Sequence, residues 1–336
     1  RVIVDQSRGG RRTTRFVSDT PIIHYYAIQS AAYAVERREW RGADLAVYYH
    51  PIHEYNVARM LNAMQASLEL YDQEFSPFQF DQMRIVEFPA YYSTFAQSSA
   101  NTIPYSEGLG FIARFDSDED DIDYVTYVTA HEVAHQWWGH QILGADMQGA
   151  NMLTESLAQY SALIAMERLY GRGQVRRFLR YELDTYLRER SAEVVEELPL
   201  MRVEQQPYIY YRKGGLVMYL LRNEIGEAAV NRALRRLLRE FAFRGAPYPR
   251  SSDLVRFLRE EAGPAHQAMI TDLFERITLY DVAASAAQAS RRTDGRWDIS
   301  LTVQAQKLYA DGQGHETVAP MNEEFEIGVF STEPGA

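Results

Sequence analysis

The sequence contains no cysteine among its 336 residues. This absence excludes disulfide bonds and thiolate ligands, so any bound metal must be held by histidine and carboxylate side chains. No apolar run approaches the roughly 20 residues that a membrane-spanning helix needs. Basic residues are also scarce, because 46 acidic residues against 35 basic ones give a net charge of −11. That charge argues against nucleic acid or an anionic membrane as the main partner, since both attract basic surfaces.

The composition is that of a globular chain with a sizeable core. Hydrophobic residues make up 46% of the sequence and aromatic residues 12%, which favours one large domain with smaller appendages. The chain begins at Arg1 and has neither an initiator methionine nor a signal-peptide pattern. We therefore expect it to be a piece of a longer protein.

Strand patterns come first along the chain and helical patterns follow. We expect strands in four stretches rich in aromatic and β-branched residues: 16–28, 43–50, 82–88 and 109–115. A helix is expected from Pro51 to Phe75, and further helices are expected at 122–138, 151–170, 173–190, 213–224, 227–243, 251–262 and 265–277. The tail from about residue 295 returns to strand-like alternation with Gly-rich turns. Strands followed by helices predict an α+β fold.

The stretch "TAHEVAHQWWGH", residues 129–140, holds three of the eight histidines. His131 and His135 are four residues apart, so on a helix they lie on one face and can bind one ion. Glu132 stands beside them, where it can take a proton from an activated water. The competing interpretation is an ordinary helix whose histidines only pack or face solvent, and a third ligand decides between the two.

Glu155, in "NMLTESLAQY", supplies that third ligand if the next helix returns antiparallel. Two imidazoles and one carboxylate leave a fourth position open, which is the pattern of a catalytic zinc site with one ion. His140 does not fit, because the extended zincin motif needs a glycine and a histidine where this chain has Trp138 and Gln141.

The acidic run "DSDEDDID", 116–123, precedes the predicted metal-binding helix. Carboxylates at this place cap free N–H groups and complement the helix dipole. The alternative is that the run attracts cationic peptides or binds calcium, although its spacing does not fit the standard calcium loop.

The sequence resembles the aminopeptidase N family of gluzincin metallopeptidases, and more closely its divergent bacterial branch fused to ABC-transporter permease segments. The likeness covers about residues 20–280 and rests on three elements: "HEVAHQWWGH" with Glu155, "PYSEGLGFI" at 104–112, and "YYRKGGLVMYLL" at 210–221. It implies a thermolysin-like zincin catalytic domain at 29–282, preceded by the end of a β domain at 1–28 and followed by the start of another at 283–336. Membrane permease segments are expected in the same parent chain.

The resemblance also implies two further site residues. Glu107 stands where the family has the glutamate that grips the free α-amine of the substrate, although Gly108 replaces an asparagine there. The alternative for Glu107 is a solvated turn residue. Tyr211 stands at the place of the family's catalytic tyrosine, with Tyr208 and Tyr210 as alternative donors.

Some positions depart from the family pattern. Nineteen residues separate His135 from Glu155, which is the count of thermolysin-like endopeptidases, yet Gln159 replaces the aspartate that those enzymes use to orient a zinc histidine. The partners of the zinc histidines are therefore not identified by the sequence. Candidates for an aromatic wall of the substrate pocket are Tyr91, Tyr92 and Phe95.

These observations predict a zinc aminopeptidase that acts on peptides, with His131, His135 and Glu155 on the metal, Glu132 as proton carrier, and Tyr211 and Glu107 on the substrate. Two alternatives stay open. One is an endopeptidase-like enzyme without amine anchoring, and the other is a catalytically silent peptide- or partner-binding domain of a membrane transporter protein.

Overall fold

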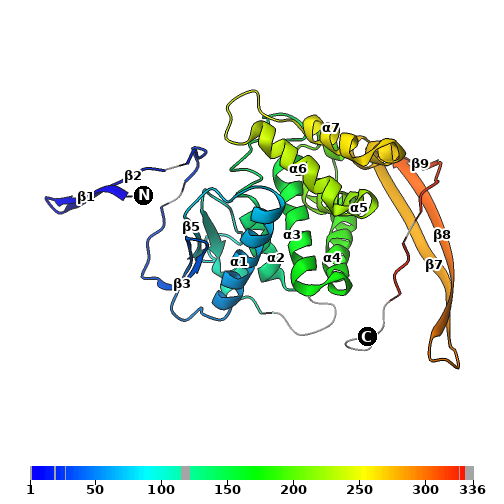
Figure 1. Ribbon diagram of the computed structural model, residues 1–336, viewed down its shortest axis with the longest axis horizontal. Helices are drawn as coiled ribbons and strands as arrows, with labels where there is room; N and C mark the ends of the chain where they lie inside the picture. The colour runs from blue at the N-terminus through cyan, green and yellow to red at the C-terminus, as the bar shows by residue number, and fades with distance from the viewer. Residues whose placement is uncertain (1, 19, 27, 115–121, 325, 330–336) are drawn as a thin grey trace.

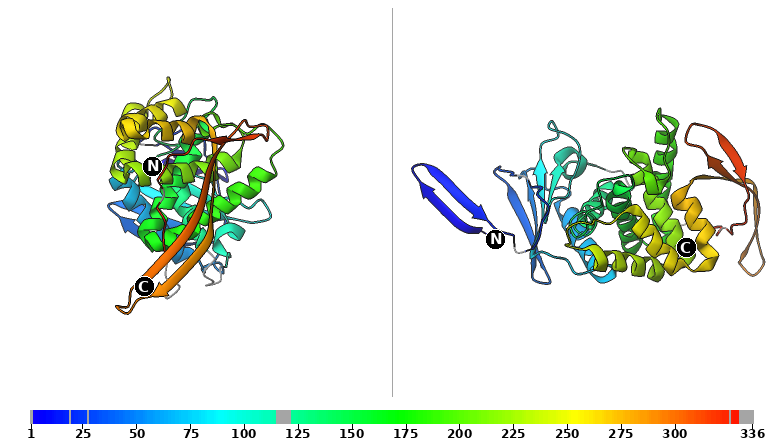
Figure 2. Two further views of the ribbon diagram at one scale, coloured as in Figure 1. Left: turned by 90° about the vertical axis from the view of Figure 1, so that its right-hand side faces the viewer. Right: turned by 90° about the horizontal axis from the view of Figure 1, so that it is seen from above.

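A computed structural model describes residues 2–18, 20–26, 28–114, 122–324 and 326–329. Its central body is a small sheet followed by a larger group of helices, with strand hairpins at both ends (Figures 1 and 2). This arrangement is the α+β architecture that the order of the sequence patterns predicts.

The central sheet has four strands in the order β3-β4-β5-β6. They span Ala34–Trp40, Ala43–Tyr49, Gln82–Phe88 and Thr102–Ser106. β3 and β4 form an antiparallel pair, whereas β4, β5 and β6 run parallel. Parallel strands need covering elements on their faces, and the helix α1, Val57–Glu74, makes the crossover from β4 to β5.

The helical part consists of α-helices and of short π- or 3-10-helical segments, which are labelled η. In chain order they are η1 (Glu107–Phe111), α2 (Tyr124–Ala134), η2 (Met152–Ser156), α3 (Leu157–Tyr170), α4 (Arg172–Ser191), η3 (Leu200–Arg202), η4 (Tyr208–Lys213), α5 (Gly214–Ile225), α6 (Glu227–Phe241), α7 (Ser251–Ala262), η5 (Pro264–His266), α8 (Gln267–Ile270) and η6 (Thr271–Glu275). α2 contacts both α1 and α3, and nine of its eleven residues are buried. A polar side chain on α2 therefore needs a partner inside the protein.

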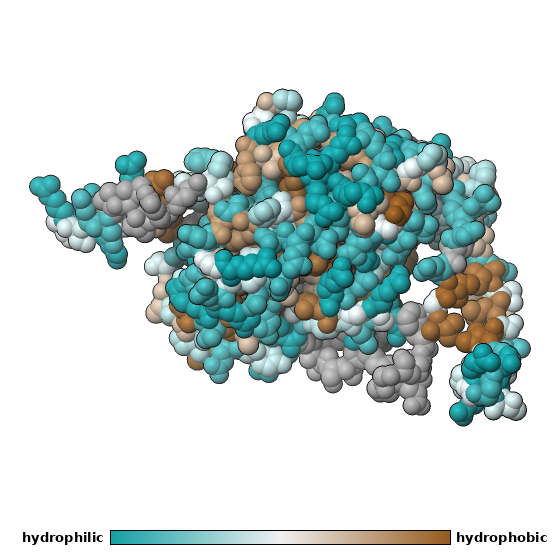
Figure 3. Space-filling model, viewed as in Figure 1, coloured by the Kyte–Doolittle hydropathy of each residue, from teal (hydrophilic) through white to brown (hydrophobic). Residues whose placement is uncertain are grey.

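Two hairpins project from the ends of this body (Figure 2). β1 (Val2–Arg8) pairs with β2 (Arg11–Phe16), and β7 (Ile277–Arg291) pairs with β8 (Trp297–Ala310), whose other edge holds β9 (Glu316–Ala319). Apolar side chains gather on the β7–β8 hairpin (Figure 3), and its exposed members are Val282, Trp297, Ile299, Leu301 and Val303. Among the residues that the structure describes, no helix combines the length and the apolar character that crossing a membrane requires.

The predictions for the strands are partly confirmed. The strands expected at 43–50 and 82–88 are β4 and β5, but the strand expected at 16–28 is wrong, because β2 ends at Phe16 and no strand follows before β3 in the described residues. The strand expected at 109–115 is also wrong: the strand is β6, and η1 follows it. Pro104 argues against a strand at this position in the sequence, because proline is tolerated in a sheet only at its edges. β6 meets this condition, since it is the last strand of the sheet.

The expected helices are confirmed with one shift. α1 starts at Val57 rather than at Pro51, because residues 51–56 form a loop in which the His53 ring is bound to Glu87 and the Asn56 amide donates to two carbonyl oxygens of the 110–113 segment. The helical part ends at Glu275, and β7 starts directly afterwards at Ile277.

Candidate metal centre

The helix α2 begins at a carboxylate cap. Asp123 accepts hydrogen bonds from the Thr126 backbone N–H (3.0 Å) and the Tyr170 hydroxyl (2.7 Å), and it also pairs with Arg59 (2.6 Å). The last residue of the acidic run thus has the capping role expected for it. Residues 116–121 lie outside the described part of the chain.

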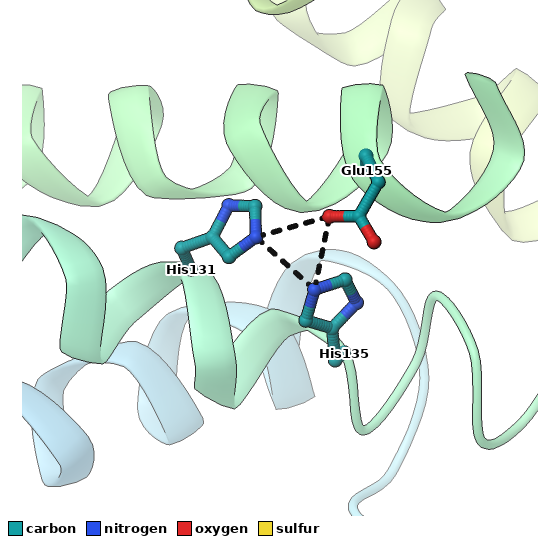
Figure 4. Close-up of side chains that lie close together, drawn as sticks. All are labelled: His131, His135 and Glu155. Atoms are coloured by element: carbon teal, nitrogen blue, oxygen red, sulfur yellow. Dashed lines mark hydrogen bonds and ion pairs between the residues drawn. The ribbon is translucent and has the colours of Figure 1, made fainter. Parts of the chain in front are cut away.

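Three side chains meet where α2 faces the start of the next helical segment (Figure 4). The His131 and His135 Nε2 atoms are 3.1 Å apart, and each lies 3.3 Å from Glu155 Oε2. Ligand atoms bound tetrahedrally to zinc at 2.0–2.1 Å are separated by about 3.3 Å. The three atoms therefore already stand at the corners of a zinc-sized triangle.

The Nδ1 atoms of the two histidines, which face away from the triangle, have different surroundings. The His135 ring donates from Nδ1 to the Trp138 carbonyl oxygen at 2.9 Å, which directs its Nε2 toward the triangle. Burial acts to lower the pKa of His135, but the charge and hydrogen bond of Glu155, the charge of Glu132 and the Trp138 carbonyl together raise this pKa to about 9. The partner that the sequence left unidentified for His135 is thus a backbone carbonyl. For His131, the Nδ1 atom is buried and has no hydrogen-bond partner in the described structure.

Glu132 points into the same region without joining the triangle. Its side chain is buried, and its Oε2 atom has no hydrogen-bond partner among the described residues. Burial raises the pKa of Glu132, although the two neighbouring histidines act in the opposite direction. A carboxylate with a raised pKa is better suited to accept and return a proton near neutral pH.

Glu155 is held in place by close backbone packing. It belongs to η2, where the neighbouring Ser156 hydroxyl donates to the Tyr210 carbonyl oxygen at 2.6 Å. A Cβ atom added to Gly214 would lie 2.1 Å from the Ser156 Oγ atom. The glycine of the "RKGG" stretch therefore lets α5 approach the segment that carries Glu155.

Tyr211 lies beside the triangle. Its ring centroid is 5.7 Å from that of His131 and 4.9 Å from that of Tyr210. Burial and the negative charge of Glu155 raise the pKa of Tyr211, so its phenol stays protonated and can donate a hydrogen bond. Tyr208 instead stacks on Tyr186 at 6.0 Å, which leaves Tyr210 as the one alternative near Glu155.

A cavity of about 210 Å³ opens next to Glu132 and Tyr211. It is lined by Thr94, Phe95, Ala96, Leu109, Tyr124, Tyr127, Val128, His131, Glu132, Gln159, Tyr211 and Arg212. Of the three residues expected to form an aromatic wall, only Phe95 lines this cavity, because Tyr91 and Tyr92 are 91% and 76% exposed.

Gln159 stands where thermolysin-like enzymes have an aspartate that orients a zinc histidine, but it makes other hydrogen bonds here. Its amide donates to the Tyr127 hydroxyl and to Glu182, and Glu182 also accepts from Arg212 at 3.2 Å. His140 stays outside the triangle, as expected, and its Nε2 atom lies 3.2 Å from the Ser98 carbonyl oxygen.

Glu107 opens η1 directly after β6 and is not a freely solvated turn residue. Its Oε1 atom accepts the Ala90 backbone N–H at 2.9 Å, while its Oε2 atom lies 3.8 Å from His53 Nδ1. Burial and the nearby charge of Glu132 raise the pKa of Tyr105, two residues earlier, and Leu109, two residues later, lines the cavity. No local sequence pattern indicates His53 and Glu87, because a loop histidine and a strand glutamate form a cluster only when the fold brings them together.

Comparison with known protein families identifies the family of this chain. The peptidase family M1 domain matches residues 59–276, which is more than half of the chain. The chain belongs to peptidase family M1. The match contains all the residues of the triangle together with Glu107, Glu132 and Tyr211.

Curated relatives of this M1 domain are aminopeptidases. The chain is 25% identical over 213 residues to endoplasmic reticulum aminopeptidase 2 of Homo sapiens, covering 61% of this chain and 22% of that protein. It is 23% identical over 275 residues to aminopeptidase M1-A of Oryza sativa subsp. japonica, covering 78% of this chain and 30% of that protein. The chain thus spans less than a third of the length of either relative.

Solved structures show the same fold. The M1 zinc metallopeptidase from Deinococcus radiodurans superposes with a TM-score of 0.57 at 17% identity, covering 81% of this chain and 58% of that chain. A mutant of that enzyme bound to a Tyr-Ser-Ala substrate gives the same TM-score at 17% identity, covering 81% of this chain and 59% of that chain. The α+β fold expected from the sequence is thus confirmed, and it is the fold that solved M1 zinc metallopeptidases share.

Proposed function

We propose that this M1 domain hydrolyses peptide bonds in a zinc-dependent reaction and releases residues from the N-termini of peptides. The observation that carries the proposal is the triangle of ligand atoms, 3.1–3.3 Å apart, beside the buried carboxylate of Glu132. The aminopeptidase relatives and the position of Glu107 support exopeptidase action.

The proposed mechanism divides the work among six side chains. His131, His135 and Glu155 hold zinc, which when bound supplies a Lewis acid for the water and the scissile carbonyl. Glu132 accepts a proton from the attacking water and returns it to the leaving amine.

Two residues act on the substrate in this proposal. The Tyr211 phenol donates a hydrogen bond to the carbonyl oxygen as negative charge develops there. Glu107 binds the protonated α-amine, which sets the scissile bond at the first residue of the peptide.

Peptides with free and N-acetylated termini test the exopeptidase part of the proposal. We expect the free peptide to be hydrolysed and the acetylated one to be hydrolysed at least tenfold more slowly, because acetylation removes the cation that Glu107 binds. Equal rates would favour an endopeptidase-like enzyme. Zinc binding with no hydrolysis of any peptide would favour the silent binding domain.

Glu132→Gln tests the proton carrier. The amide cannot accept the proton, so we expect kcat to fall by about 10²–10⁴-fold while one zinc ion per chain remains bound. Metal analysis and single-turnover assays measure the two quantities. The matched control is Glu54→Gln, an exposed glutamate of the 51–56 loop, which should keep wild-type kcat. Full activity of Glu132→Gln would exclude this mechanism.

We also propose the organisation of the parent chain that the resemblance implies. In it, residues 29–282 form the catalytic domain between β pieces at 1–28 and 283–336, and permease segments lie in the same polypeptide. Expression of 29–282 alone tests the division, since a catalytic domain with these bounds should fold and bind one zinc ion.

A further inference from the structure

A second cluster of titratable side chains lies outside the zinc triangle. It consists of His53 from the 51–56 loop, Glu87 from the end of β5, and Glu107 from the start of η1. The His53 Nδ1 atom lies 2.5 Å from Glu87 Oε1 and 3.8 Å from Glu107 Oε2. One imidazole thus faces two carboxylates.

Each carboxylate of this cluster has one oxygen fixed by a backbone N–H group. The His50 N–H donates to Glu87 Oε2 at 2.5 Å, and the Ala90 N–H donates to Glu107 Oε1 at 2.9 Å. Of the two remaining oxygens, Glu87 Oε1 is taken by His53, whereas Glu107 Oε2 is beyond hydrogen-bonding distance of it. Glu107 therefore keeps one free acceptor.

The cluster carries an excess of negative charge. Two carboxylates oppose at most one positive charge on His53, and in the described part of the chain no lysine or arginine lies within 4.0 Å of either carboxylate. The Glu87 side chain is only 4% exposed, so its charge is poorly screened, while His53 and Glu107 remain 18% and 25% exposed. Such a site favours a compact cation that approaches from the Glu107 side.

The distances fit a hydrogen-bonded pair better than a second metal site. The zinc triangle has sides of 3.1–3.3 Å, whereas the Glu87–His53 contact is 2.5 Å and the His53–Glu107 contact is 3.8 Å. Ligands of one zinc ion are about 3.3 Å apart. These distances match a cation that donates hydrogen bonds better than a metal ion, and an ammonium group has three N–H donors to offer.

We infer that the ammonium group of a peptide is recognised by Glu107 together with the Glu87–His53 pair, and not by Glu107 alone. This inference rests on the proposed aminopeptidase function. Glu107 contacts the ammonium group. Glu87 is a positioning residue that adds negative charge to the site and holds His53 away from Glu107, so that the imidazole does not occupy the free carboxylate oxygen.

Binding of two hydroxamates to the zinc-loaded protein tests the inference. Leucine hydroxamate carries the amine and 4-methylpentanoic hydroxamate lacks it, while both offer zinc the same group. The ratio of their Kd values, measured by calorimetry, therefore reports amine recognition without any turnover. We expect wild type to prefer the amine at least tenfold.

Glu87→Gln keeps the side-chain shape and removes the charge, so we expect it to lower this ratio at least tenfold with zinc content unchanged. His53→Lys, at a partly exposed position, places a permanent cation beside Glu107 and should lower the ratio as much even if Glu87→Gln fails to fold. Glu54→Gln removes a charge from the same loop at an exposed position and should leave the ratio within twofold. A merely structural role of Glu87 would weaken both hydroxamates equally and leave the ratio unchanged.

The outcomes separate the inference from the function on which it rests. A wild-type ratio near one would overturn amine anchoring altogether. A high wild-type ratio that Glu87→Gln and His53→Lys both retain would overturn only the role of the Glu87–His53 pair. Binding of a second zinc equivalent that disappears in His53→Ala would show a metal site instead and would also overturn the inference.

Discussion

At the scale of single residues, the candidate site is marked by buried polar atoms without partners. Glu132 Oε2, His131 Nδ1 and the metal-facing Glu155 Oε2 are buried and make no hydrogen bond in the described structure. Leaving such an atom unpaired costs roughly 1–3 kcal/mol. A metal ion at Glu155 Oε2 and a reacting water at Glu132 Oε2 would satisfy two of these atoms, whereas His131 Nδ1 cannot bind the ion that the Nε2 atom of the same ring faces.

Tyr211→Phe tests the oxyanion donor at this scale. Removing the hydroxyl deletes one hydrogen bond to the developing charge, and we expect kcat to fall by about 10²–10³-fold with zinc content unchanged. Steady-state kinetics on a free peptide measure the effect. Tyr210→Phe is the matched control, since the two rings are 4.9 Å apart, and it should lose less than threefold. A larger loss in Tyr210→Phe would move the donor to that residue.

At the scale of elements, the zinc ligands depend on how closely helices approach one another. Of the proposed ligands, His131 lies in α2, His135 is the residue that ends this helix, and Glu155 lies in η2, which packs against the start of α5 at Gly214. Gly215 makes a similar approach, with Gln159 Cγ 2.9 Å from the place of its Cβ atom. The two glycines are thus explained by packing rather than by chemistry.

Gly214→Ala should displace the segment that carries Glu155. The added Cβ atom would meet Ser156 at 2.1–2.6 Å, and we expect a loss of about 1–3 kcal/mol of stability together with at least tenfold weaker zinc binding. Urea unfolding and a competition assay with a zinc chelator measure the two effects.

Gly173→Ala provides the control for that substitution. Gly173 lies in α4 with no atom within 4 Å of its Cβ position, so alanine there should be neutral or stabilise by up to about 1 kcal/mol. Equal behaviour of the two variants would contradict the packing argument.

At the scale of the whole molecule, a zinc ion bound at the triangle would join separate helical segments of the chain. His131 and Glu155 come from helical segments separated by the 135–151 connection, and α2 also contacts α1. An ion that binds only the folded arrangement stabilises the whole domain by mass action.

Removal of zinc should therefore lower the melting temperature. At a free zinc concentration 100 times the Kd, the linkage contribution is about 2.7 kcal/mol. Calorimetry with zinc and with a chelator measures the shift, which Glu155→Ala should largely abolish and Glu189→Ala, at an exposed position of α4, should retain. A chelator effect of the same size in Glu155→Ala would mean that the stabilising metal binds elsewhere.

The sequence by itself determined the fold class and the residues of the zinc triangle. The spacing of His131 and His135 is a property of any helix, and the strands β4 and β5 follow from local patterns of apolar residues. Local sequence patterns did not predict β6, because pairing with β5 forms this strand despite the low strand propensity of Pro104. Proline is tolerated there because β6 is the edge strand of the sheet.

Only the tertiary structure decided which polar groups meet across the chain. The cavity beside Glu132, the Trp138 carbonyl behind His135, and the encounter of His53, Glu87 and Glu107 all join residues whose proximity no periodicity encodes. The physical reason is the distance along the chain over which each effect acts. Helical spacing relates residues that are only a few positions apart. The proximity of two carboxylates from different segments depends instead on how the sheet and its loops pack.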